Sequence, residues 1–485
     1  MIRGNRLIDL DRDLERIVGP DGIVRDPRLR MVYECDGYTL DRAVPDRVVL
    51  PRSVEECKSV VKLAHAAGTS IVPRGAGTGL AGGTLAAPGS LVIALTRLRS
   101  IEALDPLNRQ ALVQAGVANL AISRAAAPYG LHYAPDPSSQ SVSTLGGNIA
   151  GNSGGPHTLK MGVTTHHVLA LELVTPDGRS RWLGSRVPGA GGPDVAGLVV
   201  GSEGTLGLVT RAWVRLVPIP PAARTLLAAF PGVDEASRAV SAILRSGIVP
   251  AAVELMDQPI LEALHTAFRL EFPPQAGALL LVEVDGLEEG LDEEAEHAVT
   301  ACELSGAFHI ERATSDADRR RLWMARKKAF GALGRLARNY CTQDGVVPRT
   351  KLPEMLRFIA DVGRDAGIRV ANVFHAGDGN LHPILLYDER NEGEVQAVLE
   401  ASARILERCL ELGGSLTGEH GIGVEKLALM DRAFSAASLA AMDRVRRVFD
   451  PERRMNTGKA IPQGGGCFDG RAGLGRVRPG REVPL

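Results

Sequence analysis

The chain has 485 residues and a mass of 51.4 kDa, a length that predicts two or three domains with room for a sizeable core. Its 56 Lys and Arg residues balance 57 Asp and Glu residues, which argues against a protein whose main task is to coat nucleic acid or an anionic membrane. Hydrophobic residues make up 45% of the chain, which excludes a disordered polypeptide. The 55 glycines exceed the usual share and indicate loops in which backbone comes close to a bound group.

The cysteines and the N-terminal segment bear on the cellular compartment. The six cysteines form no Cys-x-x-Cys pair and are scattered at Cys35, Cys57, Cys302, Cys341, Cys409 and Cys467. This pattern fits reduced thiols and argues against a cysteine-bound iron–sulfur centre. The N-terminal segment lacks the apolar stretch of a signal peptide, and no apolar run reaches the length of a membrane span. We therefore expect a cytoplasmic protein.

The first part of the chain alternates short apolar runs with glycine-rich segments. Residues 46–73 predict a strand, a helix and a strand, with Ser53 and Glu56 as a capping box at the helix start and Gly68 as its stop. Further strands are expected at 91–95, 111–117, 169–178 and 206–218, and the glycine-rich stretches between them cover 75–89 and 146–162. Prolines at 218, 220 and 221 mark a boundary, so residues 1–220 are predicted to form the first domain.

The pattern changes beyond residue 220. It predicts a β-α-β-β-α-β arrangement, then a long helical stretch over 315–338 and two apolar strands at 371–375 and 381–387. The last third is predicted to be helical, which gives a second domain over 221–462. Residues 463–485 lack apolar periodicity and are predicted to be a disordered tail. The expected fold class is α+β.

Two glycine-rich segments suggest ligand contacts. Residues 77–82 match G-x-G-x-x-G after a strand, but no helix follows, so a Rossmann fingerprint is a poor interpretation. Consecutive glycines beside Arg74 can still form a backbone nest for phosphate. Residues 151–155 match G-x-S-x-G, but Gly155-Pro156 argues against the helix that a nucleophile elbow needs. We interpret this second segment as backbone laid against a flat ligand.

A group of histidine and glutamate residues carries the most specific chemical signal. His375 and His382 flank Asp378-Gly379 symmetrically, so a hairpin there would place the two histidines opposite each other, with Cβ atoms ~5 Å apart. TGEHGIG adds Glu419, which completes a two-histidine, one-carboxylate site suited to Zn, Mn or Fe. His420 would then be free to act as a base. A lone histidine is more often structural, but this joint pattern favours metal binding or catalysis.

Together these segments resemble a known flavoprotein family. PRGAGTGLAGG, PDPSS, TLGGNIAGNSGG, LKMGVTTHHV and GSEGTLG resemble the FAD-binding domain of the vanillyl-alcohol-oxidase/para-cresol-methylhydroxylase flavoproteins. HAGDGNLH, GEHGIG and NTGK resemble the cap domain of the D-2-hydroxy-acid dehydrogenase branch, and QDGVVPRTKLPEML is most similar to its glycolate oxidase members. The resemblance covers about residues 40–462. It implies two α+β subdomains around FAD, followed by a ferredoxin-like cap domain and C-terminal helices that return to the flavin.

The resemblance also implies a set of site residues. The cofactor positions are Arg74, Gly75, Ala76, Gly77, Thr78 and Gly79 at the pyrophosphate, Pro137, Ser138, Gly146, Gly147, Asn148 and Asn152 along the flavin, Val163, Glu203, Gly204 and Leu206 on the ribityl and adenine side, and Asn456 in the returning segment. His375, His382 and Glu419 match the metal ligands, His420 the base, Arg326 the arginine that binds the substrate carboxylate, and Asn380 a pocket residue. Residues 73–83 offer no histidine, cysteine or tyrosine for covalent attachment, so FAD is expected to be non-covalent.

The expected reaction is oxidation of glycolate or a small D-2-hydroxy acid such as D-lactate to the 2-oxo acid, with hydride transfer to FAD. Phe330 and Ile384 are apolar where relatives that take dicarboxylic acids tend to be polar, which favours a small substrate. The resemblance implies partners, an FAD-containing homologue and an iron–sulfur subunit of a glycolate oxidase complex, through which the protein would lie peripherally at the membrane. A homodimeric D-lactate dehydrogenase with a soluble acceptor is the alternative. A metal-dependent hydrolase without flavin and a non-catalytic FAD-binding subunit are alternatives from other classes.

Overall fold

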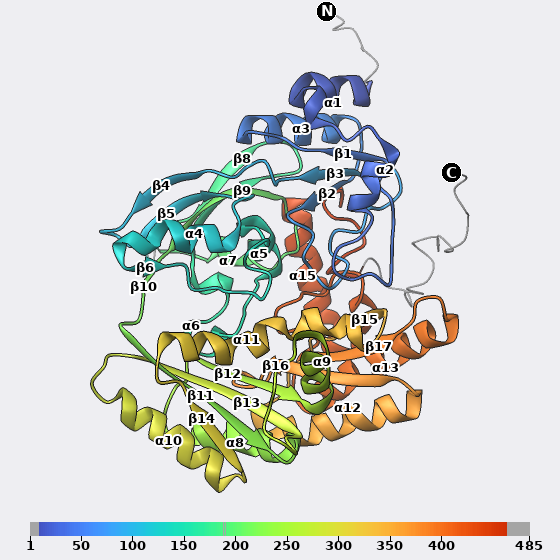
Figure 1. Ribbon diagram of the computed structural model, residues 1–485. Helices are drawn as coiled ribbons and strands as arrows, with labels where there is room; N and C mark the ends of the chain where they lie inside the picture. The colour runs from blue at the N-terminus through green and yellow to red at the C-terminus, as the bar shows by residue number, and fades with distance from the viewer. Residues whose placement is uncertain (1–8, 188, 190, 463–485) are drawn as a thin grey trace, which may run out of the picture.

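The computed structural model describes residues 9–187, 189 and 191–462, so the tail predicted for 463–485 lies outside the described residues. In Figure 1 the first part of the chain contains a three-stranded sheet, a five-stranded sheet and the short pair β6 (Leu131–His132) and β10 (Val217–Pro218), and the green-to-orange second part contains one larger sheet. The reddish C-terminal helix α15 (Ala436–Phe449) rises from the second part toward the first. None of the helices formed by the described residues is both long and apolar enough to cross a membrane.

A three-stranded parallel sheet opens the fold, with the order β1 (Arg47–Val49), β3 (Leu91–Ala94) and β2 (Ile71–Arg74). Helix α3 (Val54–Ala66) connects β1 with β2, and the Ser53 hydroxyl accepts the N–H of Glu56 at 3.1 Å. The Glu56 carboxylate accepts the N–H of Arg52 at 2.7 Å. The strand, helix and strand predicted for residues 46–73 are therefore confirmed, with the cap at the predicted serine.

A five-stranded antiparallel sheet follows, in the order β4-β5-β9-β7-β8. Its strands are β4 (Ile101–Asp105), β5 (Gln110–Gln114), β7 (Val168–Val174), β8 (Ser180–Gly184) and β9 (Leu208–Arg215). Helices α4 (Asn119–Ala126) and α5 (Leu145–Gly151) contribute to the same apolar core as the inner faces of β5, β7 and β9. The two sheets give the expected pair of α+β subdomains.

A seven-stranded sheet forms the centre of the second half, in the order β14-β11-β13-β12-β16-β17-β15. The first four positions have ferredoxin-like order, and the helices that connect them include α8 (Val233–Arg245) and α10 (Leu291–Leu304). Helix α9 (Gln258–Phe268) is an addition that the predicted layout did not include. The strands are β11 (Ala222–Phe230), β12 (Ala252–Asp257), β13 (Ala278–Gly286), β14 (His309–Arg312), β15 (Asn339–Thr342), β16 (Arg369–His375) and β17 (Pro383–Tyr387).

The hairpin of β16 and β17 is confirmed, but its register differs from the symmetric one that the sequence suggested. Ala371 pairs with Ile384, and His375 bridges Asn380 rather than His382. The turn is therefore centred between Gly377 and Asp378, one residue earlier than the symmetric arrangement required. The two histidine rings still approach each other, with centroids 5.2 Å apart in an edge-to-face arrangement. Proximity survives the shift because His382 lies at a diagonal position two residues from the true partner.

The remaining helices cover the large sheet and lead the chain back to the first half. They include α11 (Asp316–Ala332), α12 (Leu352–Ala366) and α13 (Glu392–Glu411). After α15, Met455 bridges Ile71 of β2, and the N–H of Asn456 donates to the Ile71 carbonyl at 2.7 Å. The Asn456 side-chain amide donates to the carbonyls of Gly83 and Glu203 at 2.9 and 2.6 Å. The C-terminal segment thus closes the structure against the glycine-rich loop.

Candidate active site

A cavity of about 870 Å³ lies between the two halves of the molecule. The glycine-rich loop after β2, residues 136–151 and the loop 202–209 form one side. Helix α11 and the segment around residues 419–420 form the other. Ligand pockets in proteins commonly enclose ~300–1,000 Å³. One large ligand and a small second molecule could therefore share this space.

The loop after β2 is shaped for close backbone approach. A Cβ at Gly75 would lie 2.5 Å from the Thr144 hydroxyl, and one at Gly146 would lie 2.7 Å from the Cβ of Ala115. Gly77 adopts φ +74°, a conformation that L side chains rarely adopt. Within the described chain the backbone N–H groups of residues 75–79 donate to no other group, so they remain available as a nest for an anion. The donor set fits the pyrophosphate of a dinucleotide.

Most of the residues expected at the cofactor line this cavity: Arg74, Gly75, Ala76, Gly77, Thr78, Gly79, Pro137, Ser138, Gly146, Gly147, Asn148, Glu203, Gly204 and Asn456. Three others, Asn152, Val163 and Leu206, are not among the residues that line it. Asn152 has φ +52° and its side chain accepts the N–H of Thr165 at 2.9 Å. Val163 precedes the short turn 164–166, and Leu206 packs in the apolar core of the antiparallel sheet.

Glu203 connects the two halves of the structure at the cavity. Its carboxylate accepts the N–H groups of Ile422 and Gly423, each at 2.7 Å. Burial raises the pKa of Glu203, and these two N–H groups oppose that rise. The loop that carries Glu419 and His420 is therefore held directly against the first half of the chain.

Three buried side chains converge beside the cavity. The Oε1 atom of Glu419 lies 3.4 Å from Nε2 of His375 and 3.2 Å from Nε2 of His382. These three ligand atoms all lie within 4.8 Å of one another, as a shared divalent cation requires. Burial disfavours the charge on Glu419, but the two histidines outweigh it and hold the pKa of this carboxyl well below its usual range. An ionised carboxylate between two imidazoles is a donor set that fits a metal ion.

Each of these histidines is oriented through its other ring nitrogen. Nδ1 of His375 lies 2.6 Å from Oε1 of Glu254, and Nδ1 of His382 lies 3.3 Å from the backbone carbonyl of Gln343. Both Nε2 atoms are thereby left facing Glu419. Metal-binding histidines commonly have such a carboxylate or carbonyl partner behind them. The Nδ1 contacts of both histidines are therefore of the kind found behind metal-binding histidines.

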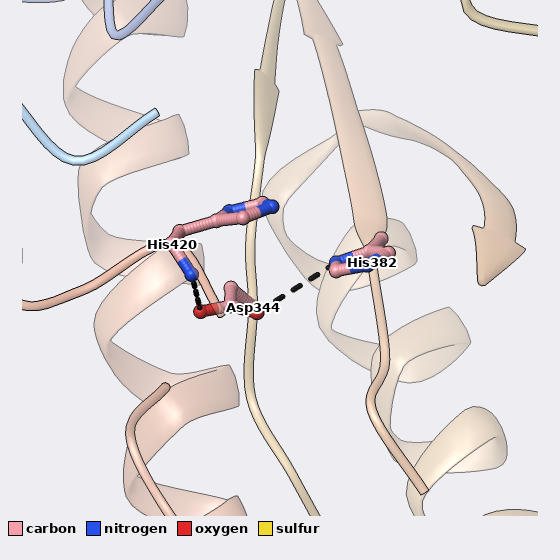
Figure 2. A group of neighbouring side chains, drawn as sticks. All are labelled: Asp344, His382 and His420. Atoms are coloured by element: carbon pink, nitrogen blue, oxygen red, sulfur yellow. Dashed lines mark hydrogen bonds and ion pairs between the residues drawn. The ribbon is translucent and has the colours of Figure 1, made fainter. Parts of the chain in front are cut away.

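Asp344 fixes the loop that carries His420. Its carboxylate accepts the backbone N–H groups of residues 418–420 at 2.9–3.2 Å and lies 3.4 Å from the ammonium of Lys426. Figure 2 shows Asp344 between the backbone of His420 and the ring of His382, whose Nδ1 is 3.9 Å away. Asp344, His382 and His420 form a second group with metal-ligand spacing. Because the Asp344 oxygens are already occupied by these donors, the group around Glu419 is the better metal site.

His420 lines the cavity next to that group. Its ring stacks on His382 with centroids 4.9 Å apart and an interplanar angle of 3°. Its Nδ1 is buried and, among the described residues, has no hydrogen-bond partner. Burial lowers the pKa of His420 to about 4 against the opposing effect of Asp344. The neutral imidazole therefore has a free nitrogen able to accept a proton.

Helix α11 presents one face to the cavity. Arg319, Trp323, Arg326 and Phe330 recur at helical spacing and all line it. Arg326 is buried and ion-paired through Nε with Glu254, while its Nη2 finds no partner in the described part of the chain.

Ile384 has no exposed surface and packs in an apolar core, so it does not face the cavity. Asn380 is buried beside Gly418, outside the cavity lining.

Sequence reasoning missed two residues that organise this site. Glu254 links Arg326 to His375, and Asp344 pins the His420 loop. A signal for Glu254 was present, because it is the charged residue within the apolar run VELM of a predicted strand. The position of Asp344 just after a strand gave no comparable signal. Its role depends on a loop about 75 residues further along the chain.

Comparison with known proteins identifies FAD-related families in both halves of the chain. Residues 45–184 match the FAD binding domain family, and residues 219–460 match the family described as FAD linked oxidases, C-terminal domain. The domain boundaries at 220 and 462 stay a prediction. The chain is 43% identical over 430 residues to glycolate oxidase subunit GlcD of Escherichia coli (strain K12), covering 89% of this chain and 86% of the relative.

Two further relatives extend this picture. The chain is 38% identical over 452 residues to glycolate oxidase subunit GlcD of Bacillus subtilis (strain 168), covering 93% of this chain and 96% of the relative. It is 32% identical over 416 residues to D-lactate dehydrogenase of Archaeoglobus fulgidus, with 85% and 91% coverage.

The fold is shared with solved flavoenzyme structures of much lower identity. A 4-ethylphenol oxidase from Gulosibacter chungangensis superposes with a TM-score of 0.76 at 17% identity, over 94% of this chain and 97% of that one. A p-cresol methylhydroxylase gives a TM-score of 0.76 at 16% identity, over 93% and 96%. The expected fold class is therefore confirmed. With relatives above 30% identity along most of its length, the chain belongs to the FAD-linked oxidase family and is an FAD-dependent oxidoreductase.

Proposed function

We propose that this protein oxidises glycolate or D-lactate to the corresponding 2-oxo acid, with FAD as the hydride acceptor. The observation that carries the proposal is that one cavity joins the glycine-rich loops to Arg326, Glu419 and His420. A dinucleotide nest, the guanidinium-bearing Arg326 and the neutral imidazole of His420 thus line the same space. A 2-hydroxy acid has a carboxylate, which the arginine can bind, and a hydroxyl, whose proton the imidazole can accept. The names of the GlcD and D-lactate dehydrogenase relatives supply the two candidate substrates.

FAD would be held non-covalently by the loop 74–79, the segment around Asn148 and the returning Asn456. When bound, it supplies the acceptor for the hydride on the substrate α-carbon. The loop has no histidine, cysteine or tyrosine that could form a bond to the flavin. Acid precipitation of the purified protein should therefore release the yellow chromophore into the supernatant, whereas a covalent flavin would stay in the pellet.

His375, His382 and Glu419 would hold a divalent metal such as Zn, Mn or Fe. A metal there supplies a Lewis acid that lowers the pKa of the substrate hydroxyl. Behind these ligands, Glu254 and the Gln343 carbonyl keep each Nε2 directed toward Glu419. The chain thus has both the donor atoms and their supports.

Arg326 would bind the substrate carboxylate with its guanidinium, whose Nη2 has no partner among the described residues, while its Nε stays on Glu254. Phe330, one turn further along α11, lines the same part of the cavity. Its apolar ring offers nothing to a second carboxylate and favours a small substrate. Asn380 is buried beside the Glu419 loop, and its side-chain oxygen has no partner among the described residues; it would support that loop.

His420 would accept the proton from the substrate hydroxyl. Its neutral state at pH 7 follows from its burial, and its Nδ1 carries no competing hydrogen bond within the described residues. A general base within reach of the hydroxyl contributes ~10²–10⁴-fold to the rate. As the hydroxyl proton moves to His420, the α-carbon loses hydride and the carbinol becomes a carbonyl.

The electrons must then leave the flavin. We propose that partner subunits of a glycolate oxidase complex, an FAD-containing homologue and an iron–sulfur subunit, accept them at a membrane surface. The subunit names of the GlcD relatives support this assignment. The competing arrangement is a homodimer that uses a soluble acceptor. Co-purification from a strain that also expresses the FAD-containing homologue and the iron–sulfur subunit distinguishes the complex, in which these subunits come along, from the homodimer, in which they do not.

The deciding experiment is the anaerobic visible spectrum of the metal-supplemented protein, with glycolate and D-lactate added in separate cuvettes. We expect a flavin band that bleaches, faster with the true substrate. A flavin band that is inert to both acids would overturn the proposed substrates. A flavin-free hydrolase is disfavoured by the family match over both halves, and a non-catalytic subunit is disfavoured by the complete set of site groups.

A further inference from the structure

Glu254 is a carboxylate in an unusually apolar place. It lies on β12, every residue of which is buried, and its own side chain has no exposed surface. An ionised carboxylate is costly in such surroundings unless it is fully paired. The groups around Glu254 must therefore pair with its carboxylate and offset the cost of burying it.

Both of its oxygens are engaged by residues from different elements. Glu254 stands directly opposite His375 in the pairing of β12 with β16, which brings the two side chains together. Oε1 lies 2.6 Å from Nδ1 of His375, and Oε2 forms an ion pair with Nε of Arg326 from α11. One carboxylate thus connects a strand histidine with a helix arginine.

The other ends of those two side chains face the site. Nε2 of His375 lies 3.4 Å from Glu419, while Nη2 of Arg326 has no partner in the described chain. Arg326 itself lines the cavity. Glu254 therefore holds one nitrogen of each side chain, so that Nε2 of His375 stays directed at Glu419 and the remaining guanidinium nitrogens of Arg326 are left for a ligand.

We propose that Glu254 is a positioning residue that sets the distance between the substrate carboxylate site at Arg326 and the metal site at His375. This inference rests on the proposed function. A 2-hydroxy acid has its carboxylate and hydroxyl on adjacent carbons, so the two sites must hold a fixed short separation. A single rigid carboxylate behind both achieves this better than two independent supports.

The test compares Glu254→Gln with a matched control, Glu283→Gln. Glu283 is a buried carboxylate on the adjacent strand β13 that is paired with Arg319 of the same helix at 2.6 Å and with Trp323 at 2.7 Å. It touches none of the proposed metal ligands in the described structure. Each variant is reconstituted with FAD and Mn²⁺, and Mn²⁺ affinity is measured by competition with a chelator, beside FAD content and KM for the faster substrate.

We expect Glu254→Gln to keep its FAD, to bind Mn²⁺ roughly 10- to 100-fold more weakly, and to show a raised KM. Glu283→Gln should keep wild-type Mn²⁺ affinity even where its Tm falls. Equal Mn²⁺ affinity in Glu254→Gln and wild type, or an equal loss in both variants, overturns the proposal. So does a wild-type protein that takes up no added metal.

Glu254→Asp is the second variant, because it keeps the charge but shortens the reach by one methylene. If Glu254→Gln does not fold, we expect Glu254→Asp to carry the same loss of Mn²⁺ affinity, and an unchanged affinity overturns the proposal. Mn²⁺ binding needs no turnover. A wild type that binds Mn²⁺ but leaves its flavin unbleached therefore refutes the substrates and not the role of Glu254.

Discussion

At the scale of single residues, the site depends on atoms left without partners. His420 and Arg326 each keep one buried side-chain nitrogen without a partner in the described chain, while Asp344 holds the backbone N–H of His420 and Glu254 holds Nε of Arg326. Buried polar atoms without partners cost ~1–3 kcal/mol each. Such a cost is tolerated where a ligand completes the bonding, which agrees with the substrate site proposed beside these two residues.

Replacing His420 by Ala should slow flavin reduction ~10²–10⁴-fold, because the proton acceptor is lost, while FAD stays bound. Anaerobic stopped-flow absorbance with saturating substrate measures the rate. His297→Ala, an exposed histidine on α10, is the control. Unchanged reduction kinetics in His420→Ala would remove this residue from the base role.

Arg326→Lys should raise KM roughly 10- to 100-fold, since a single ammonium cannot both pair with Glu254 and bind a carboxylate in planar geometry. Steady-state kinetics measure the change, with FAD absorbance confirming that the cofactor site is intact. Arg238→Lys on α8, at an exposed pair with Glu235, is the control. A KM equal to that of wild type would place the substrate carboxylate elsewhere.

At the scale of elements, the predicted local patterns were right and the predicted register was wrong. The serine cap of α3 and the absence of a helix after the glycine loop follow from the nearby sequence. The β16–β17 hairpin was also foreseen, yet its pairing is His375 with Asn380. Symmetry about Asp378-Gly379 could not reveal this, because β15 and β12 on either side of the hairpin also constrain its register.

The cap of α3 gives a stability prediction. Ser53→Ala removes the acceptor of the Glu56 N–H and should lower the free energy of unfolding by ~1 kcal/mol. Urea unfolding followed by circular dichroism measures it. An unchanged midpoint would mean that the Glu56 carboxylate on Arg52 N–H suffices to start the helix.

The glycine loop gives a cofactor prediction. Gly75→Ala places a Cβ 2.5 Å from the Thr144 hydroxyl, so the loop must move away from α5, and we expect less FAD per protein after purification. Gly286→Ala is the matched control, because a Cβ there meets nothing within 4 Å. Full FAD content in Gly75→Ala would show that the loop tolerates the displacement.

At the scale of the whole molecule, charged side chains join the two halves around the cavity. Lys160 pairs with Asp285, and Nδ1 of His157 lies 2.7 Å from Asp136 while its Nε2 lies 3.9 Å from Glu283. His157 also stacks on Trp323 with ring centroids 5.9 Å apart. These contacts connect residues 136–160 with β13 and α11, so the cavity depends on both halves remaining docked.

The docking contact of His157 should be sensitive to pH. Burial opposes its charge, but Asp136 and Glu283 raise its pKa to about 10, above the ordinary value of ~6.5. The folded state therefore binds the proton more tightly, and the resulting stabilisation is complete below about pH 6.5 and lost as the pH rises toward about 10. We expect the Tm of wild type to fall over this range more than that of His157→Gln. Parallel Tm profiles would contradict the prediction.

The sequence by itself determined the flavoprotein family, the α+β class and the residue types of the site, because glycine spacing, helix caps and the histidine–glutamate pattern are local properties of the chain. Only the tertiary structure decided that Glu254 stands behind both Arg326 and His375, and that Asp344 holds the His420 loop. It also placed Leu206 in a core and Ile384 away from the cavity. The physical reason is that these contacts join residues about 70 to 120 positions apart, and only the docking of strand on strand and helix on sheet brings them within bonding distance.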